Sequence, residues 1–214
     1  MLASLNSLFQ LLGWGECRVK GIRIQKQTYC SEERELTKGD YKQLLKAALK
    51  DEQLYLILQT ICATGIRVSE LQYFTVEAVE SWEITVSCKG KTRTIFLPGD
   101  LRKRLRSFAK RRRIGSGHIF RNKRGGALDR SVIWRKMMQL CQITKVASTK
   151  VFPHNLRKLF ARTFYAIDRD LTQLADLLGH SSINTTRIYI ISSGQEHRRK
   201  IERMGLVMPE KMVT

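Results

Sequence analysis

Hydrophobic positions follow a helical period along most of the chain. Leu2, Leu5, Phe9 and Leu12 recur at helical spacing, which predicts a first helix ending at Gly13. A threonine followed three residues later by an acid, at 37 and 40, is typical of a helix start. Helices are predicted over residues 37–49, 53–63, from about 69 onward, and over 101–113, 129–142, 154–167, 170–178, 183–192 and 195–204.

One stretch changes to a two-residue period. Residues 82–87 and 93–97 are rich in β-branched and aromatic side chains and flank Lys89-Gly90-Lys91, which predicts a hairpin with a basic tip. Pro98 ends the second strand, and residues 118–120 form a short extended piece. The predicted class is α+β, mostly α-helical, with one small antiparallel sheet.

Composition narrows the class of protein. The 214 residues are 43% hydrophobic, enough for one domain with a core. The longest apolar runs, near 54–58, are too short to span a membrane, and residues 1–14 lack the basic start of a signal peptide. Five cysteines without CxxC spacing argue against disulfides and a zinc ribbon. We therefore expect a cytoplasmic protein without a membrane partner.

Charge points to a polyanionic partner. The net charge is +20, and residues 101–150 hold sixteen basic side chains and one acid. Such a concentration is the footprint of nucleic-acid binding, although a solvated helix face or an assembly tail would also produce it. No phosphate loop and no cluster of acidic metal ligands stands out, so we expect no cofactor and no metal. Cationic side chains would then carry any chemistry on a phosphodiester.

Several polar residues could carry such chemistry, although each alone has a simpler explanation. Arg67 follows Gly65 and could merely pair with Glu70, Lys89 could be a solvated turn residue, and Tyr189 could be a core aromatic. His154 and Arg157, three residues apart at the start of a helix, share one face. His180 after Gly179 could be a helix-end residue.

The order of these residues along the chain is a more specific signal than any one of them alone. The segments Ala63–Leu71, His154–Arg157 and Leu178–Ser181, the last followed by Thr185-Thr186-Arg187-Ile188-Tyr189, resemble the three boxes of the tyrosine recombinase (phage-integrase) family. The resemblance covers the family's catalytic domain, from about residue 35 to 200, and implies that domain's fold. The extended segment before Thr37 also resembles the interdomain linker of integrases from conjugative transposons, or of a similar mobile element.

The resemblance implies a site-specific recombinase that needs neither metal nor ATP. Tyr189 would be the nucleophile, giving a 3′-phosphotyrosine and a free 5′-hydroxyl. Arg67 and Arg157 would stabilise negative charge on the phosphate, since a guanidinium donates paired hydrogen bonds and stays ionised. His154 would assist proton transfer at Tyr189.

Two further roles are implied. His180 would hydrogen-bond the phosphate or hold Tyr189. Lys89 would protonate the leaving 5′-oxygen, although Lys91 could take its place because the hairpin is one residue shorter than usual in the family. The remaining candidates for contacts with double-stranded DNA are the basic residues of 102–113 and, more specifically, Lys91, Arg93, Arg121, Lys123, Arg124 and Arg130.

The resemblance also predicts the organisation of the chain. Residues 1–13 would be the remnant of the last helix of a core-binding domain, 14–36 a linker, and 37–214 the catalytic domain, with a helical tail from about 195. We expect a homotetramer on DNA, a monomer or weak dimer without it, and a bacterial location on the nucleoid when bound. The alternatives are a catalytically silent DNA-binding remnant or regulator, and an enzyme that relaxes supercoils like a type IB topoisomerase.

Overall fold

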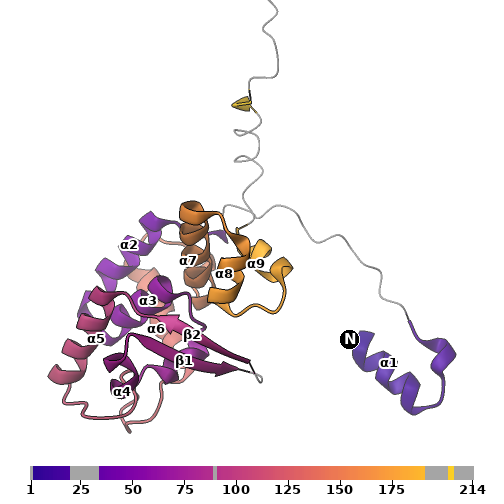
Figure 1. Ribbon diagram of the computed structural model, residues 1–214, viewed down its shortest axis with the longest axis horizontal. Helices are drawn as coiled ribbons and strands as arrows, with labels where there is room; N and C mark the ends of the chain where they lie inside the picture. Colours follow the sequence, from indigo (N-terminus) through magenta and orange to yellow (C-terminus); the bar gives the residue numbers. More distant parts are fainter. Residues whose placement is uncertain (1, 20–33, 89–90, 191–201, 205–214) are drawn as a thin grey trace, which may run out of the picture.

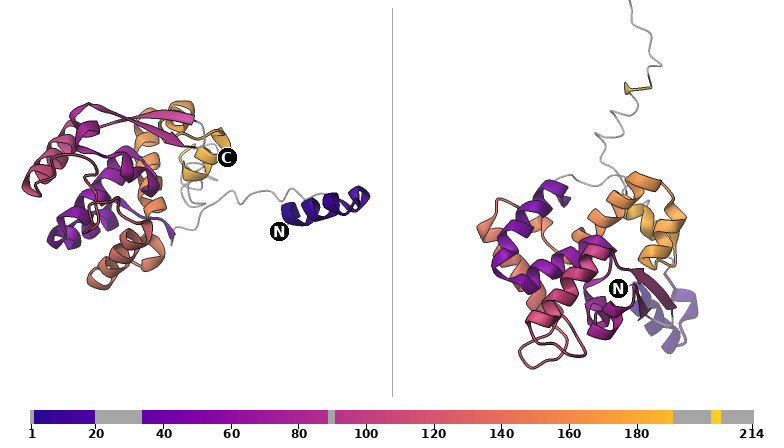
Figure 2. Two further views of the ribbon diagram at one scale, coloured as in Figure 1. Left: turned by 90° about the horizontal axis from the view of Figure 1, so that it is seen from below. Right: turned by 60° about the vertical axis from the view of Figure 1, so that its left-hand side comes forward.

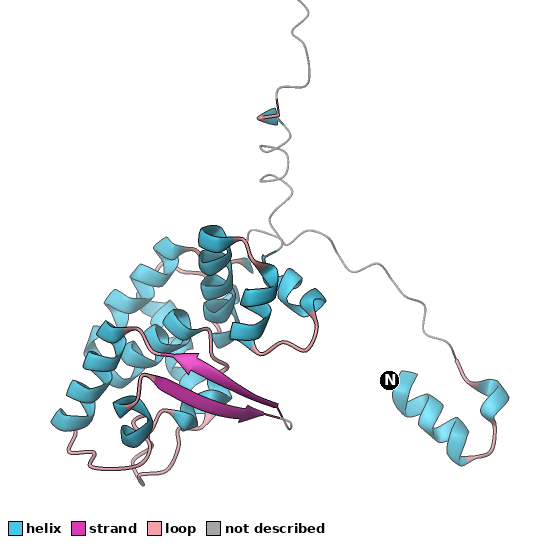
Figure 3. Ribbon diagram, viewed as in Figure 1, coloured by secondary structure: helices cyan, strands magenta, loops and turns pink. Residues whose placement is uncertain are grey.

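The computed structural model describes residues 2–19, 34–88, 91–190 and 202–204. These residues form helices and one two-stranded antiparallel sheet, which lies along one side of the helices (Figures 1 and 3), and the mostly helical class agrees with the sequence prediction. The helices are α1 (Leu2–Leu11), α2 (Lys38–Ala47), α3 (Glu52–Thr64), α4 (Val76–Glu80), α5 (Gly99–Arg111), α6 (Arg130–Ile143), α7 (Pro153–Asp168), α8 (Leu171–Leu178) and α9 (Ile183–Ile190). The strands are β1 (Glu83–Cys88) and β2 (Lys91–Phe96), and short 3-10 helices are η1 (Gly15–Cys17), η3 (Ala48–Lys50), η4 (Val68–Tyr73) and η5 (Ser148–Lys150).

Local sequence signals set the helix ends. The Thr37 hydroxyl accepts from the Asp40 amide and the Asp40 carboxylate accepts from the Thr37 amide, both at 3.0 Å, which confirms the predicted capping box. Pro153 opens α7, where a missing N–H costs nothing. Gly65 and Gly179 end α3 and α8 in the left-handed conformation. At both glycines the chain reverses direction as the helix ends.

The structure corrects several predicted elements. The segment from 68 to 73 is a 3-10 helix instead of an α-helix, and its three-residue turn stacks Glu70 over Arg67. Helix α4, capped by Thr75, is a separate helix and not the continuation of one that starts near 69. Lys91 belongs to β2 and pairs with Cys88, so it lies in the strand and not at the predicted tip of the hairpin. The predicted helix over 195–204 falls almost entirely outside the described residues.

Apolar side chains form two clusters. The main core joins α2, α3, α5, α6 and the inner face of the hairpin, and it includes Leu36. Leu36, the last residue of the predicted linker, therefore packs in this core with 1% of its surface exposed. A smaller cluster lies where α7, α8 and α9 meet, around Ala161, Leu174, Leu178 and Tyr189. The hairpin runs from α4 and α5 toward α8 (Figures 1 and 2), which brings β2 beside the second cluster.

No described helix is long and apolar enough to cross a membrane.

Candidate active site

Arg67 is positioned by the reversal at Gly65. This glycine has a φ of 63°, and a Cβ there would lie 2.3 Å from the ring of Phe160. Two residues later, Arg67 turns back onto its own 3-10 helix. Its Nη1 donates to Glu70 Oε1 at 3.0 Å, and its Nη2 lies 3.4 Å from the carbonyl of Gly179. Arg67 therefore does form the ion pair with Glu70 that the sequence suggested. Its side chain is still 37% exposed.

Glu70 joins two arginines. Its side chain is 3% exposed, and Oε2 accepts from the backbone amide of Arg67 at 2.7 Å and from Nη2 of Arg93. A buried carboxylate is tolerated only where it is paired and hydrogen-bonded. Glu70 meets both conditions, so the orientation of Arg67 depends on it.

Arg157 is the most deeply buried arginine of the site, with 2% of its surface exposed. Its guanidinium donates to the carbonyls of Gly65 and Leu178, which end α3 and α8. Nη2 also lies 3.1 Å from His180 Nε2. Burial, and then the positive charge of Arg67, lowers the pKa of Arg157 to about 10, so it remains protonated at neutral pH.

His180 is held in one tautomer. A guanidinium nitrogen can only donate, so His180 Nε2 must accept from Arg157 and the ring proton must lie on Nδ1. Nδ1 then donates to the buried hydroxyl of Thr186 at 2.8 Å. Burial, and then the charges of Arg157, Arg67 and Arg93, lowers the pKa of His180 to about 4. The ring is therefore neutral at physiological pH.

Tyr189 lies at the centre of the group. It comes from α9, is 8% exposed, and its ring meets those of His154 and His180 edge-on with centroids 4.9 and 5.0 Å apart. Its hydroxyl is 3.3 Å from Nδ1 of His154, and the Arg157 guanidinium lies 6.0 Å from its ring. Burial, followed by the charges of Lys158 and Arg157, lowers the pKa of His154. Nδ1 of a neutral His154 can accept a proton from the phenol.

These side chains face a cleft of about 900 Å³. Its lining includes Arg67, His154, Arg157 and Tyr189, together with Arg130 in the first turn of α6. The structure therefore brings together five of the six predicted catalytic residues, from segments that lie up to 122 residues apart in the sequence. The sixth, Lys89, lies outside the described residues, as does the side chain of Lys91.

The predicted DNA contacts divide into two sets. Lys123 and Arg124 are exposed and, with the half-buried Arg121, line a hollow of about 620 Å³ that also takes in Arg112 and Lys136. Arg130 lies in the active-site cleft. Arg93 differs from its prediction as a DNA contact, because its side chain is 11% exposed and its terminal nitrogens are bonded inside the protein.

Two residues of the site were not singled out by sequence reasoning. Glu70 was considered only as a partner of Arg67, and Thr186 only as part of a motif. A signal existed for Arg93: it lies two residues from the buried Ile95, so the alternation of β2 places it on the inner face.

Comparisons with known proteins agree with this geometry. Residues 34–196 match the model of the Phage integrase family. Tyrosine recombinase XerA of Pyrococcus furiosus is 31% identical over 97% of this chain and 73% of its own length. Tyrosine recombinase XerD of Chlamydia trachomatis is 33% identical over 62% of this chain, which spans 46% of that relative. The XerH site-specific recombinase, solved bound to difH substrate in a pre-cleavage complex, superposes with a TM-score of 0.69 at 22% identity over 96% of this chain and 64% of that one.

The fold and the boxes thus define a catalytic domain of the tyrosine-type site-specific recombinases. The chain belongs to the phage integrase family.

Proposed function

We propose that this chain cuts and rejoins double-stranded DNA at a specific site through a covalent bond between Tyr189 and a 3′-phosphate. The observation that carries the proposal is the phenol of Tyr189, held 3.3 Å from a histidine nitrogen beside a buried, protonated arginine. The named recombinases among the relatives favour this over supercoil relaxation or a silent DNA-binding remnant.

In the first step, the oxygen of Tyr189 forms a bond to the scissile phosphorus as the bond from phosphorus to the 5′-oxygen breaks. A phenol has a pKa of about 10 and must lose its proton during attack. His154 Nδ1 is placed to accept it. The leaving 5′-oxygen needs a proton in turn, and we assign that donation to Lys89, with Lys91 as its substitute. Reversal with a different 5′-hydroxyl rejoins the strands.

Arg67 and Arg157 would bind the non-bridging phosphate oxygens, where negative charge gathers in the transition state. Arg157 suits this because its described bonds go to carbonyls and a neutral imidazole, which leave its positive charge uncancelled. Its Nε is buried and has no partner among the described residues. His180 would hold Arg157 and the ring of Tyr189 in place, because its one ring proton is donated to Thr186 and its other nitrogen accepts from Arg157.

Phosphate contacts outside the active site would come from Arg121, Lys123 and Arg124 around the basic hollow, and from Arg130 in the cleft. Such contacts set the register of a protein on a duplex without reading bases. We further propose a homotetramer on DNA, and a monomer or weak dimer in its absence. We also propose a location in the cytoplasm, on the nucleoid of a bacterial cell when the protein is bound to DNA.

The proposal is tested by trapping the covalent intermediate. The protein is incubated with fragmented genomic DNA, quenched with detergent and examined for protein–DNA adducts. We expect adducts with the parent chain and none with Tyr189→Phe. Tyr165→Phe is the matched control, because Tyr165 packs against the same small cluster and should leave adduct formation unchanged.

Sequencing of the attached DNA would give the recombination site and show whether it belongs to a mobile element. Equal adduct yield from Tyr189→Phe would exclude Tyr189 as the nucleophile. DNA binding without any adduct would favour the silent-remnant alternative.

A further inference from the structure

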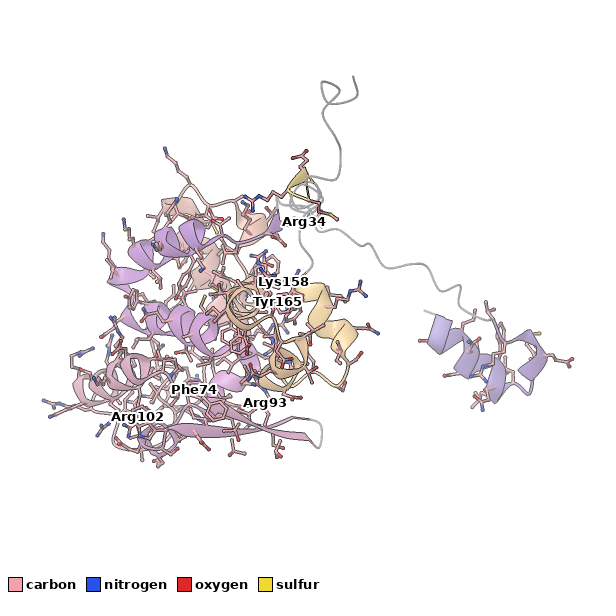
Figure 4. The ribbon with its side chains drawn as sticks, turned by 45° about the horizontal axis from the view of Figure 1, so that its top comes forward. Arg34, Phe74, Arg93, Arg102, Lys158 and Tyr165 are labelled. Atoms are coloured by element: carbon pink, nitrogen blue, oxygen red, sulfur yellow. The ribbon has the colours of Figure 1, made fainter. Side chains whose placement is uncertain are left out.

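Arg93 connects strand β2 with Glu70 of η4 and with the end of α8. It lies on β2 opposite Val86, with its side chain turned toward the second cluster (Figure 4). Nη2 donates to Oε2 of Glu70, and Nη1 donates to the carbonyl of Leu177 near the end of α8. Its acceptors are 23 and 84 residues away in sequence, so the hairpin is tied to two other segments through one side chain.

The bond to Glu70 carries the effect of Arg93 to Arg67. Glu70 accepts from the amide and the guanidinium of Arg67 and from Arg93. Without Arg93, half of the charge compensation of a buried carboxylate is lost, and such a carboxylate would reorient toward solvent or toward Arg67 alone. Either movement would shift the guanidinium of Arg67, whose Nη2 is oriented toward Gly179.

The bond to Leu177 carries the effect of Arg93 to His180. The last carbonyls of a helix have no partner within the helix and favour positive charge. At the end of α8, Arg93 takes the carbonyl of Leu177 and Arg157 takes that of Leu178. His180 follows two residues later, so two arginines fix the point from which its ring extends.

Gly179 shows how closely Arg93 is packed there. This glycine has a φ of 61°, and a Cβ on it would lie 2.4 Å from Cδ and 2.9 Å from Nε of Arg93. A side chain at 179 would therefore displace the Arg93 stem. A glycine is therefore required at 179 for two reasons: the left-handed turn, and the close packing of Arg93.

We infer that Arg93 is a positioning residue for strand cleavage, which orients Arg67 through Glu70 and His180 through the end of α8 without touching DNA. The inference rests on the proposed function. It differs from a DNA contact, because both terminal nitrogens are bonded to the protein and the side chain is nearly buried.

The test uses Arg93→Lys, which keeps the charge but loses the two-pronged geometry, and Arg93→Met, which loses both. Single-turnover cleavage at saturating protein is measured on the duplex recovered from the adduct experiment. A second duplex carries a methylphosphonate at the scissile position, where a neutral methyl group replaces one charged non-bridging oxygen. This substrate needs less help from Arg67.

We expect Arg93→Met to slow cleavage of the normal duplex on the order of 10²-fold, as loss of one donor to a transition state does, and Arg93→Lys to lose less. On the methylphosphonate the defect should shrink to within about threefold, because misplacing Arg67 then costs little. The dissociation constant for DNA and its salt dependence should stay unchanged.

Three outcomes would overturn the inference. A weaker, less salt-dependent affinity with a normal rate at saturation would make Arg93 a DNA contact. Equal loss on both substrates, accompanied by a lower unfolding midpoint, would reduce its role to stability. Normal cleavage by both variants would remove any role. If the parent chain itself forms no Tyr189 adduct, the proposed function fails, and the inference fails with it.

A second measurement does not depend on catalysis. Gly179→Ala and Arg93→Ala, which removes the side-chain atoms that a Cβ at 179 would meet, are combined, and the urea midpoints of the single and double variants are compared. Gly117→Ala is the matched control, since Gly117 has a φ of 75° and nothing within 4 Å of its Cβ position. We expect Gly179→Ala to lower the midpoint more than the control does, and the excess to disappear when Arg93 is Ala. Simple additivity would contradict the packing described here.

Discussion

Arg157 and Arg93 lie in the interior, 2% and 11% exposed, and each donates to the carbonyls that end a helix. Arg106 and Arg111 on α5 are more than half exposed and pair with Glu80 and Glu52. In Figure 4, Arg102 of α5 and Arg93 lie well apart, beside different ends of the hairpin. The same side chain thus serves two purposes in one fold.

Arg157 and the α5 arginines differ in whether a carboxylate offsets the charge, whereas Arg93 is itself paired with Glu70. On α5, carboxylates from other segments neutralise part of the positive charge. The positive charge that α5 has available for DNA is therefore smaller than its composition indicates. Arg157 bonds to carbonyls and a neutral histidine, and among the described residues it forms no ion pair. Its charge remains available, and its position is fixed before any phosphate arrives.

The largest expected effect comes from removing that fixed charge geometry. Arg157→Lys keeps a positive charge but cannot reach both carbonyls and the phosphate together. Single-turnover cleavage should fall on the order of 10²–10³-fold, with the affinity for DNA within a few-fold of the parent. A carbonyl left unpaired at Gly65 or Leu178 should also lower the free energy of unfolding by about 1–3 kcal/mol.

Arg106→Gln is the matched control, because it removes an equally charged but exposed side chain. It should leave the cleavage rate unchanged. The free energy of unfolding should change by no more than about 0.5 kcal/mol. Equal losses in the two variants would contradict the distinction between buried and exposed arginines.

The histidine beside these arginines gives a second, smaller effect. The pKa of His180 is lowered to about 4, mainly by burial and then by the charge of Arg157. The other charged groups that act on it are Arg67, Arg93 and His154, and Thr186 bonds its other nitrogen. In the unfolded chain its pKa returns to about 6.5. Protons thus bind the unfolded state more tightly, and stability falls as pH drops from about 6.5 toward 4.

Urea unfolding of the DNA-free protein at pH 7.5, 6.0 and 5.0 measures this slope. His180→Gln should flatten it while keeping an acceptor for Arg157. His154, whose pKa is lowered in the same direction, accounts for the slope that remains. An unchanged slope in the variant would show that His180 titrates normally in the folded state.

Sequence reasoning succeeded where local pattern determines structure. The capping box at Thr37, the Pro153 start of α7 and the Gly179 end of α8 were readable because each is encoded within a few residues. The three boxes led to the cluster around Tyr189, which the structure assembles from α7, α8 and α9. The roles of its residues stay predictions.

Sequence reasoning failed where a charge finds its partner far along the chain. Nothing local shows that Arg93 pairs with Glu70, or that Arg111 pairs with Glu52, 59 residues earlier. A run of basic residues fixes the net charge but not how much of it faces solvent. The error at Ser69 is a local one, because the segment expected to start an α-helix there forms a 3-10 helix, in which Glu70 lies over Arg67.

The smallest expected effect separates two exposed surfaces. Lys123 and Arg124 lie at the hollow beside α6 and form no ion pair among the described residues, whereas Arg106 and Arg111 are paired. Each phosphate contact contributes about −0.9 to the slope of log affinity against log salt concentration. The double variant Lys123→Gln/Arg124→Gln should therefore reduce the magnitude of the slope by about 2, and Arg106→Gln/Arg111→Gln by less than about 0.5.

Both pairs remove two positive charges, so a general effect of net charge would change the two slopes equally. A larger change from the α5 pair would mean that DNA draws Arg106 and Arg111 away from Glu80 and Glu52. The cleavage rate at saturating protein should be normal in both double variants, because neither surface reaches the phosphate at Tyr189. A slower rate from the Lys123 and Arg124 pair would instead mean that this loop contacts the DNA strand that is cut. Basic residues that only bind DNA could then not be separated from those that act on the cleavage rate.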